Sequence, residues 1–185
     1  MANYAAQAVS GGNAFTGGRV TVRRADRLTA AERDELAKLL IACVAEGASL
    51  GFLAPLTMGA ARDWWDTFPR DGVLLLLAEC DGHITGTVQL HDAESANGAH
   101  RGEVAKLLVH PAWRRQGIGR ALITALETEA RAAGKTLLVL DTREGDPSND
   151  LYRALDYCNG GRIPGWARDA SGTLSATVFW YKTLG

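Results

Sequence analysis

The segment from His110 to Leu122 carries two glycines and three arginines where an apolar strand pattern gives way to a helical one. A helix N-terminus leaves backbone N–H groups unpaired and carries about half a positive charge. Gly117 and Gly119 have no Cβ atoms that would keep an anion away from these N–H groups. The segment therefore predicts a phosphate-binding turn. A dinucleotide-binding fingerprint is excluded because Leu122 stands where the third glycine is needed, and a P-loop is excluded because Gly-Lys-Ser/Thr is absent.

Two carboxylates follow strand patterns near this turn. Glu103 begins an apolar run in which alternation places Ala105, Leu107 and Val109 on its own face, and partial burial there is expected to raise its pKa. Asp141 ends the next run, and ligands of open α/β sheets lie beyond the carboxyl ends of strands. The residues leave structural alternatives open, which are a rim position for Glu103 and a helix cap or loop hydrogen bond for Asp141.

Tyr152 lies one residue from an expected helical stripe. The stripe consists of apolar residues at helical spacing, which are Leu151, Ala154, Leu155 and Cys158. One residue is about 100° on a helix, so we expect Tyr152 to flank the buried face. It then either projects into a cleft or is an ordinary half-buried tyrosine.

The periodicities predict an α/β chain. We expect strands over residues 19–24, 72–80, 83–91, 103–110, 137–141 and 176–183, with another near residue 162. Helices are expected over 29–46, 58–68 and 119–133, and from residue 146 onward. Asp81-Gly82 predicts a hairpin, and Thr29 with Glu32 predicts a capping box. The strand, helix and strand from 103 to 141 predict a parallel strand pair.

Length, composition and charge are typical of one soluble domain. The chain has 185 residues, 46% hydrophobic and 22% charged, and at this size roughly 70% of the unfolded surface is buried. A formal net charge of -1 gives no reason to expect nucleic acid or an anionic membrane as partner. The longest apolar run is too short for a membrane span, and no signal pattern opens the chain. We expect a flexible tail over residues 1–18, one domain over 19–185 and a cytoplasmic location.

The cysteines and histidines show no metal-binding or disulfide pattern. Cys43, Cys80 and Cys158 are far apart, so we expect three reduced core thiols and no metal site. The aromatic residues around the second helix have two interpretations, as a wall of an acceptor pocket or as core. These residues are Phe52, Trp64, Trp65 and Phe68.

The turn Arg114-Arg115-Gln116-Gly117-Ile118-Gly119 resembles the pyrophosphate-binding turn of the GNAT superfamily of N-acetyltransferases. From about residue 46 to 185 the chain is similar to the tabtoxin-resistance acetyltransferases within that superfamily. The similar stretches are 47–52, 103–107, 140–142, 152–155, 164–166 and 181–185. The resemblance implies a mixed, mainly antiparallel sheet with a central parallel strand pair and helices on both faces. The chain departs from the superfamily at Gly145, where an asparagine is often found.

The resemblance also implies acetyl-CoA as cosubstrate and roles for particular residues. The cofactor-binding candidates cluster around the turn and are Leu108, Val109, Arg114, Arg115, Gln116, Gly117, Ile118, Gly119 and Arg120. Backbone N–H groups near Val109 would hold the thioester carbonyl, and Tyr152 would protonate the leaving thiolate. An amine with a pKa of about 10.4 must lose a proton before it attacks. Glu103 is our candidate base and Asp141 would orient the ammonium, although these two assignments can be exchanged.

We therefore expect a cytoplasmic N-acetyltransferase, a monomer or homodimer, that transfers acetyl directly to a small-molecule amine. An amino-acid-like toxin or antibiotic is one candidate acceptor. Two alternatives stay open, which are a protein lysine or N-terminal acetyltransferase and an acyl-CoA-binding sensor module without catalysis.

Overall fold

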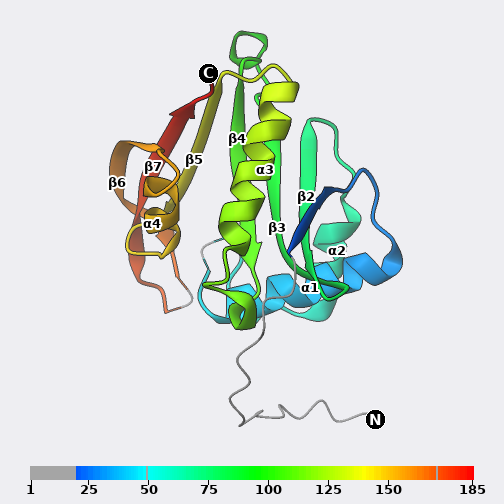
Figure 1. The fold of residues 1–185 in the computed structure, drawn as a ribbon. Helices are drawn as coiled ribbons and strands as arrows, with labels where there is room; N and C mark the ends of the chain where they lie inside the picture. Colours follow the sequence, from blue (N-terminus) through cyan, green and yellow to red (C-terminus); the bar gives the residue numbers. More distant parts are fainter. Residues whose placement is uncertain (1–19, 49, 170) are drawn as a thin grey trace, which may run out of the picture.

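One seven-stranded sheet with helices on both faces runs through the described chain (Figure 1). The computed structural model describes residues 20–48, 50–169 and 171–185, so the tail expected over residues 1–18 lies outside the described residues. The elements are β1 (Thr21–Arg24), α1 (Ala30–Ala45), α2 (Met58–Asp66), β2 (Val73–Cys80), β3 (His83–Asp92), β4 (Arg101–Val109), α3 (Ile118–Ala132), β5 (Leu137–Arg143), α4 (Ser148–Arg153), β6 (Cys158–Arg168) and β7 (Leu174–Thr183).

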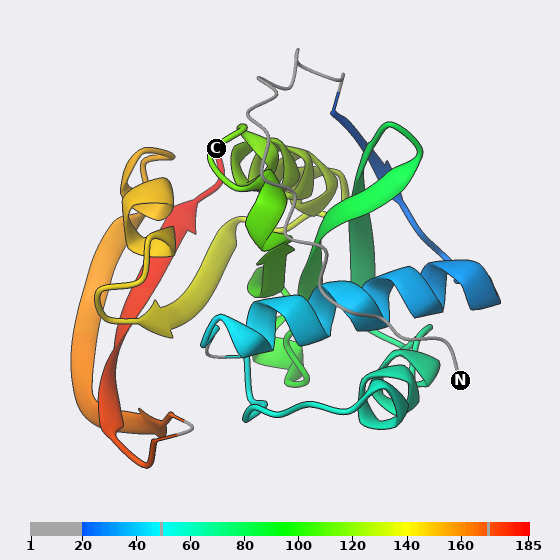
Figure 2. The same ribbon diagram turned by 90° about the horizontal axis from the view of Figure 1, so that it is seen from below.

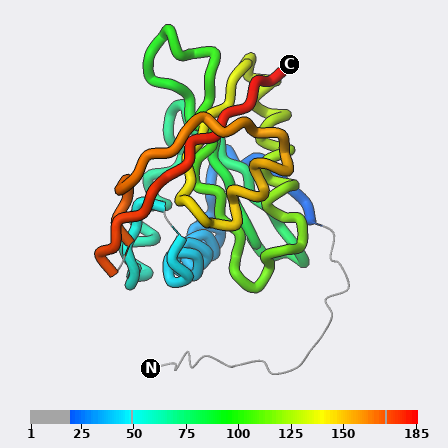
Figure 3. Tube along the Cα trace, turned by 90° about the vertical axis from the view of Figure 1, so that its left-hand side faces the viewer, coloured from blue at the N-terminus to red at the C-terminus, as the bar shows by residue number. Residues whose placement is uncertain are grey.

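The strand order is β1-β2-β3-β4-β5-β7-β6. Five of the six neighbouring pairs are antiparallel, and β4 with β5 is the parallel pair. Asp81 and Gly82 join β2 to β3 with φ values of 51° and 79°, as a tight hairpin of primed type requires. Figure 3 shows β6 and β7 side by side along the edge of the sheet that faces the viewer. The predicted mixed fold with its central parallel pair is confirmed.

Two hydrophobic cores lie on opposite faces of the sheet (Figure 2). On one face α3 and α4 cover a core whose fully buried members include Leu122, Ile123 and Leu126. On the other face α1 and α2 cover a second core that includes Leu36, Leu40 and Trp65. Each helix buries one apolar stripe, as amphipathic spacing predicts.

A β-bulge in β4 changes which residues share a face. Ala105 pairs with Gln89 and Leu108 pairs with Thr87, so Lys106 and Leu107 together oppose one residue of β3. Lys106 has a φ of 52°, in the left-handed region. An extra residue of this kind shifts the alternation of side chains by one position.

The bulge overturns one expectation about Glu103. Val104 packs into the core under α3, whereas Leu108 packs into the core under α1. Leu107 and Val109 pack against the α3 core, so Glu103, next to Val104, lies on the opposite face from them. The predicted shared face of Glu103, Leu107 and Val109 is wrong, because uninterrupted alternation does not hold across a bulge.

The last helix, α4, is shorter than the apolar stripe from Leu151 to Cys158 predicted. It ends at Arg153, and Cys158 opens β6 with an exposed side chain, whereas Cys43 and Cys80 are buried as expected. Asp156 takes a left-handed conformation with φ of 61°, which turns the chain out of the helix before the stripe is complete. The expectation of three core thiols therefore fails at Cys158.

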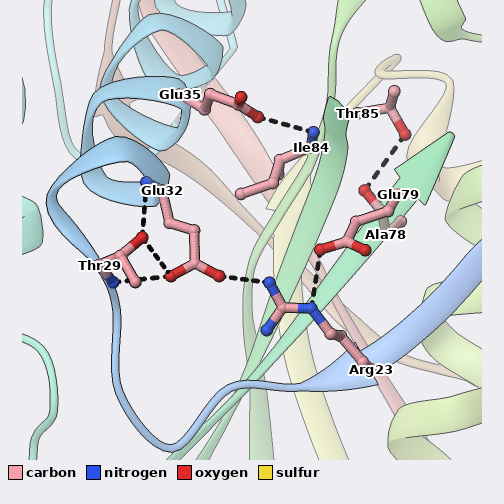
Figure 4. A network of polar contacts seen from close by, with 8 residues as sticks. All are labelled: Arg23, Thr29, Glu32, Glu35, Ala78, Glu79, Ile84 and Thr85. Atoms are coloured by element: carbon pink, nitrogen blue, oxygen red, sulfur yellow. Dashed lines mark hydrogen bonds and ion pairs between the residues drawn. The ribbon is translucent and has the colours of Figure 1, made fainter. Parts of the chain in front are cut away.

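The capping box begins α1 and connects it to the sheet (Figure 4). The Thr29 hydroxyl accepts from the Glu32 N–H at 3.2 Å, and the Glu32 carboxylate accepts from the Thr29 N–H at 2.7 Å. The same carboxylate pairs with Arg23 of β1, which also donates to Glu79 of β2 at 2.7 Å. Gly47, with a φ of 80°, follows the last turn. These contacts fix where α1 starts and ends relative to the sheet.

We predict that Thr29→Ala lowers the free energy of unfolding by about 1 kcal/mol, since it removes one half of the capping box. For a chain of this size that corresponds to a melting temperature about 2–4 °C lower by calorimetry. Thr128→Ala is the matched control, because its exposed hydroxyl donates to Thr124 O inside α3 and caps no helix. Equal melting temperatures for the two variants would contradict a stabilising cap.

Candidate active site

A cavity opens where β4 and β5 diverge. The two strands pair at only three positions, from Arg101 with Leu137 to Glu103 with Val139. Beyond them the strands spread apart (Figure 1), so residues 104–109 have no strand partner on the β5 side. The cavity has a volume of about 1130 Å³ and is lined by both strands, the start of α3, α4 and part of β6. Backbone groups on the free edge of β4 face this space and can bind an extended ligand.

The glycine turn lies at the open end of this cavity. Gly117 is the N-cap of α3 with a φ of 82°, and no side chain caps the helix there. A Cβ at Gly117 would meet nothing within 4 Å, so its glycine serves the backbone conformation and leaves the N–H groups accessible. At Gly119 a Cβ would lie 3.2 Å from Leu151, so that glycine makes room for α4. The two glycines therefore have different roles. Only Gly117 fits the prediction that a missing Cβ lets an anion approach the N–H groups.

Eight of the nine predicted cofactor-binding residues line the cavity, and Gln116 does not. Ile118 is 1% exposed and belongs to the core, so only its backbone is available. The guanidinium of Arg114 donates to Val109 O at 3.3 Å, and that of Arg120 donates to Ala154 O at 3.4 Å. All three arginines are exposed, which suits binding of phosphate groups at the rim.

The two predicted carboxylates come from the two diverging strands and line the same cavity. Asp141 accepts a hydrogen bond from the Thr177 hydroxyl of β7 at 2.9 Å, which is a contact between strands and not a helix cap. Glu103 is exposed, so the partial burial expected for it is wrong, because it lies past the edge of the helices that cover β4. Across the described residues, neither carboxylate has a cation within ion-pair distance.

Tyr152 is more deeply buried than its flanking position predicted. Its side chain is 4% exposed, lines the cavity and lies with its ring 5.5 Å from that of Tyr157. Burial, aided by the charge of Asp141, raises the pKa of Tyr152 well above its usual value. The hydroxyl therefore stays protonated at neutral pH.

Lys106 is a site residue that sequence reasoning missed. Its Nζ donates to Leu50 O at 2.7 Å and lies 5.9 Å from the ring centre of Phe52. Burial lowers the pKa of Lys106, while the charges of Glu103 and Asp141 act in the opposite direction. A signal was present in the sequence, because a lysine inside the apolar run 104–109 conflicts with a buried strand position.

The aromatic residues around the second helix belong to the core or pack against it, and none of the four lines the cavity. Trp65 and Phe68 are buried in the core under α1. Trp64 is half-buried and meets Phe52 edge to face, with ring centres 5.7 Å apart. Trp166, from β6, lines the cavity and is 52% exposed. The aromatic side chain that lines the cavity besides Tyr152 therefore comes from the C-terminal hairpin and not from the second helix.

Within 20–48, 50–169 and 171–185 no three His, Cys, Asp or Glu side chains gather as a metal site would require. No helix over these ranges has the length and apolar character needed to cross a membrane.

The strand divergence, the glycine turn at a helix start and the buried tyrosine all contribute to this one cavity of a mixed α/β fold. Residues 37–157 match the sequence pattern of the Acetyltransferase (GNAT) family. A curated relative, the N-acetyltransferase of the hisH-hisA intergenic region of Azospirillum brasilense, is 33% identical over 133 residues, which is 68% of this chain and 76% of that one. The chain belongs to the GNAT family and is an acetyltransferase.

Solved structures share this fold. yncA from Salmonella typhimurium, described with its cofactor acetyl-CoA, superimposes with a TM-score of 0.75 at 23% identity, over 90% of this chain and 94% of that chain. The ribosomal-protein-alanine N-acetyltransferase of Brucella melitensis gives a TM-score of 0.76 at 23% identity, over 89% and 99%. At these identities the likeness shows the fold alone.

We predict that Gly117→Val weakens acetyl-CoA binding at least about tenfold, or about 1.4 kcal/mol, measured by calorimetry. A branched side chain at positive φ displaces the N–H groups that the turn offers to phosphate. Gly134→Val is the matched control, because Gly134 follows the other end of α3 with a φ of 75° and also has nothing within 4 Å of a Cβ. It carries the same backbone strain away from the cavity, so equal losses in both variants would contradict a cofactor role for the turn.

Proposed function

We propose that this acetyltransferase moves the acetyl group of acetyl-CoA directly to the amine of a small molecule. One observation carries the proposal, which is that a single cavity holds the glycine turn, the free edge of β4, two carboxylates and a buried tyrosine. The first two features fit a phosphorylated, extended cosubstrate. The last three fit proton transfer around a reacting amine and thiol.

The chain's own groups suit acetyl-CoA along the length of the cavity. The N–H groups at the start of α3 and the three neighbouring arginines would hold its phosphates. Backbone groups of Leu108 and Val109 on the free edge of β4 would hold the extended arm, and N–H groups near Val109 would stabilise negative charge on the thioester oxygen. Acetyl-CoA itself supplies the activated acetyl group.

Proton transfer is assigned to the three predicted side chains. Glu103 takes the amine proton, through water, and Asp141 orients the ammonium beforehand. Both carboxylates are exposed, so a difference in burial does not identify which of them is the base. We assign the base to Glu103 because it belongs to β4, the strand whose edge would hold the thioester. Tyr152, protonated at neutral pH, donates to the leaving thiolate.

A covalent acetyl-cysteine intermediate fits this site poorly. Cys43 of α1 lines the cavity, but burial raises the pKa of its thiol, and the thiol donates to Val109 O at 3.5 Å. The thiolate is the nucleophilic form of cysteine, and a buried neutral thiol supplies little of it. Direct transfer is therefore the proposed route.

A small acceptor is proposed because the cavity has walls on both sides. Leu50 and Gly51 line one side, and Trp166 and Ala167 of β6 line the other. The resemblance to tabtoxin-resistance acetyltransferases extends the proposal to an amino-acid-like toxin or antibiotic. The exposure of both carboxylates favours the second candidate, a protein N-terminal or lysine acceptor.

A panel of amines tested with acetyl-CoA, with free thiol as the readout, decides among these functions. The panel contains amino acids, amine antibiotics and unstructured peptides with a free N-terminus or lysine. Thiol release that depends on a small amine supports the proposal, and release with peptides alone supports the protein acetyltransferase. Tight acetyl-CoA binding without release on any acceptor would indicate a sensor module.

We predict that Tyr152→Phe lowers kcat by about 10²-fold and leaves the affinity for acetyl-CoA unchanged, because only the donated proton is lost. Tyr157→Phe is the matched control, since Tyr157 is equally buried and its ring neighbours Tyr152, but it does not line the cavity. Steady-state kinetics and calorimetry measure the two quantities. Wild-type kcat in Tyr152→Phe would leave that residue with a packing role.

We predict that Glu103→Gln and Asp141→Asn change the pH dependence of kcat in different ways. A base must be ionised, so activity falls as pH drops through its pKa, and Glu103→Gln should remove or shift this acidic limb of kcat. Asp141→Asn should keep the limb and raise the amine KM, because it weakens ammonium binding. Profiles from pH about 6 to 9 measure both effects. If both variants keep wild-type kcat and KM across that range, the two carboxylates take no part in the chemistry.

A further inference from the structure

Lys106 connects the central strand to the segment over residues 50–52, which precedes α2. Its Nζ donates to Leu50 O at 2.7 Å. The ammonium also lies 5.9 Å from the ring centre of Phe52 and 6.0 Å from that of Trp64, close enough for attraction to both rings. A single side chain thus meets the start of the segment, its end and the helix that follows it.

The bulge in β4 is what allows this contact. With regular alternation Lys106 would share the face of Val104 and enter the core under α3. The left-handed φ of 52° at Lys106 turns the side chain to the cavity instead. A non-glycine residue in this region is disfavoured and persists where surrounding contacts hold it. The hydrogen bond from Lys106 Nζ to Leu50 O is one such contact.

The choice of partner for Lys106 matters for the site. Glu103, Asp141 and Arg70 all act on its charge, and two of these are carboxylates. Even so, Nζ donates its hydrogen bond to a backbone carbonyl, and no ion pair within 4 Å joins it to Glu103 or Asp141 among the described residues. Both carboxylates therefore remain available to an incoming ammonium.

We propose that Lys106 is a specificity-determining positioning residue that acts through Leu50. It holds the segment over residues 50–52 as the fixed wall of the acceptor end of the cavity, and it sets which amines fit there. This inference rests on the proposed function for the identity of the acceptor end. Leu50 and Gly51 line the same cavity as Glu103, so a change in their position changes the space available there.

Three variants test the proposal. Lys106→Met keeps the length and apolar stem of the side chain and removes the donor, and Lys106→Arg keeps a donor. Lys135→Met is the control, because the Nζ of Lys135 also donates to a loop carbonyl, Ala99 O, at 2.9 Å, but Lys135 does not line the cavity. Lys135 is more buried than the half-buried Lys106 and also pairs with Asp92 at 2.7 Å, so a general effect of losing a lysine would be at least as large in Lys135→Met.

We expect Lys106→Met to raise the KM for the best amine of the panel at least about tenfold, with kcat within about threefold and the acetyl-CoA affinity unchanged. In the same variant, the kcat/KM values for amines of different size should differ from one another less than they do in the wild type. Lys106→Arg should restore the wild-type KM, and Lys135→Met should leave both constants unchanged. Equal KM in Lys106→Met and wild type, or a loss shared with Lys135→Met, would overturn the proposal.

Limited proteolysis gives a readout that does not depend on activity. Chymotrypsin can cleave after Phe52 or the exposed Leu53, and release of the segment in Lys106→Met should speed this cleavage at least about tenfold. The two control variants should match wild type. If no amine accepts acetyl, the proposed function fails while faster cleavage still supports the contact. If wild type is active but neither cleavage nor KM changes, the role of Lys106 is the part that fails.

Discussion

The site depends on the place where β4 and β5 stop pairing. Two parallel strands that stayed in register to their ends would satisfy each other's backbone groups and leave no room between them. Here pairing ends at Glu103 with Val139, and the rest of β4 keeps a free edge. The cavity, the access to backbone N–H groups and the separation of the two carboxylates all follow from that divergence.

The helices on the two faces hold the divergence open. Under α3 and α4 the core extends to Trp180 of β7, and the buried Tyr152 belongs to it. Under α1 and α2 a separate core reaches β4 through Leu108. The bulge at Lys106 moves Leu108 to the face opposite Val104, so Leu108 packs under α1 while Leu107 and Val109 pack against the core under α3. The same irregularity turns Lys106 to the cavity, so packing and site geometry share one cause.

Charge is distributed along the cavity in a way that matches its two ends. Arginines 114, 115 and 120 surround the helix start, where an anion gains most from the unpaired N–H groups. Glu103 and Asp141 lie at the other end, and Lys106 moderates their charge without forming an ion pair with either. A net charge of -1 for the whole chain conceals this separation, because opposite local charges cancel in the sum.

The sequence by itself determined most of the elements and the glycine turn before α3. Short-range signals such as Thr29 with Glu32, Asp81-Gly82 and the glycines after β4 act through neighbouring residues, so they can be interpreted without the fold. Tertiary structure alone decided the bulge at Lys106, the burial of Tyr152, the exposure of Glu103 and the early end of α4. Each of these depends on contacts between segments far apart in the chain. Local periodicity assumes an uninterrupted strand or helix and cannot contain that information.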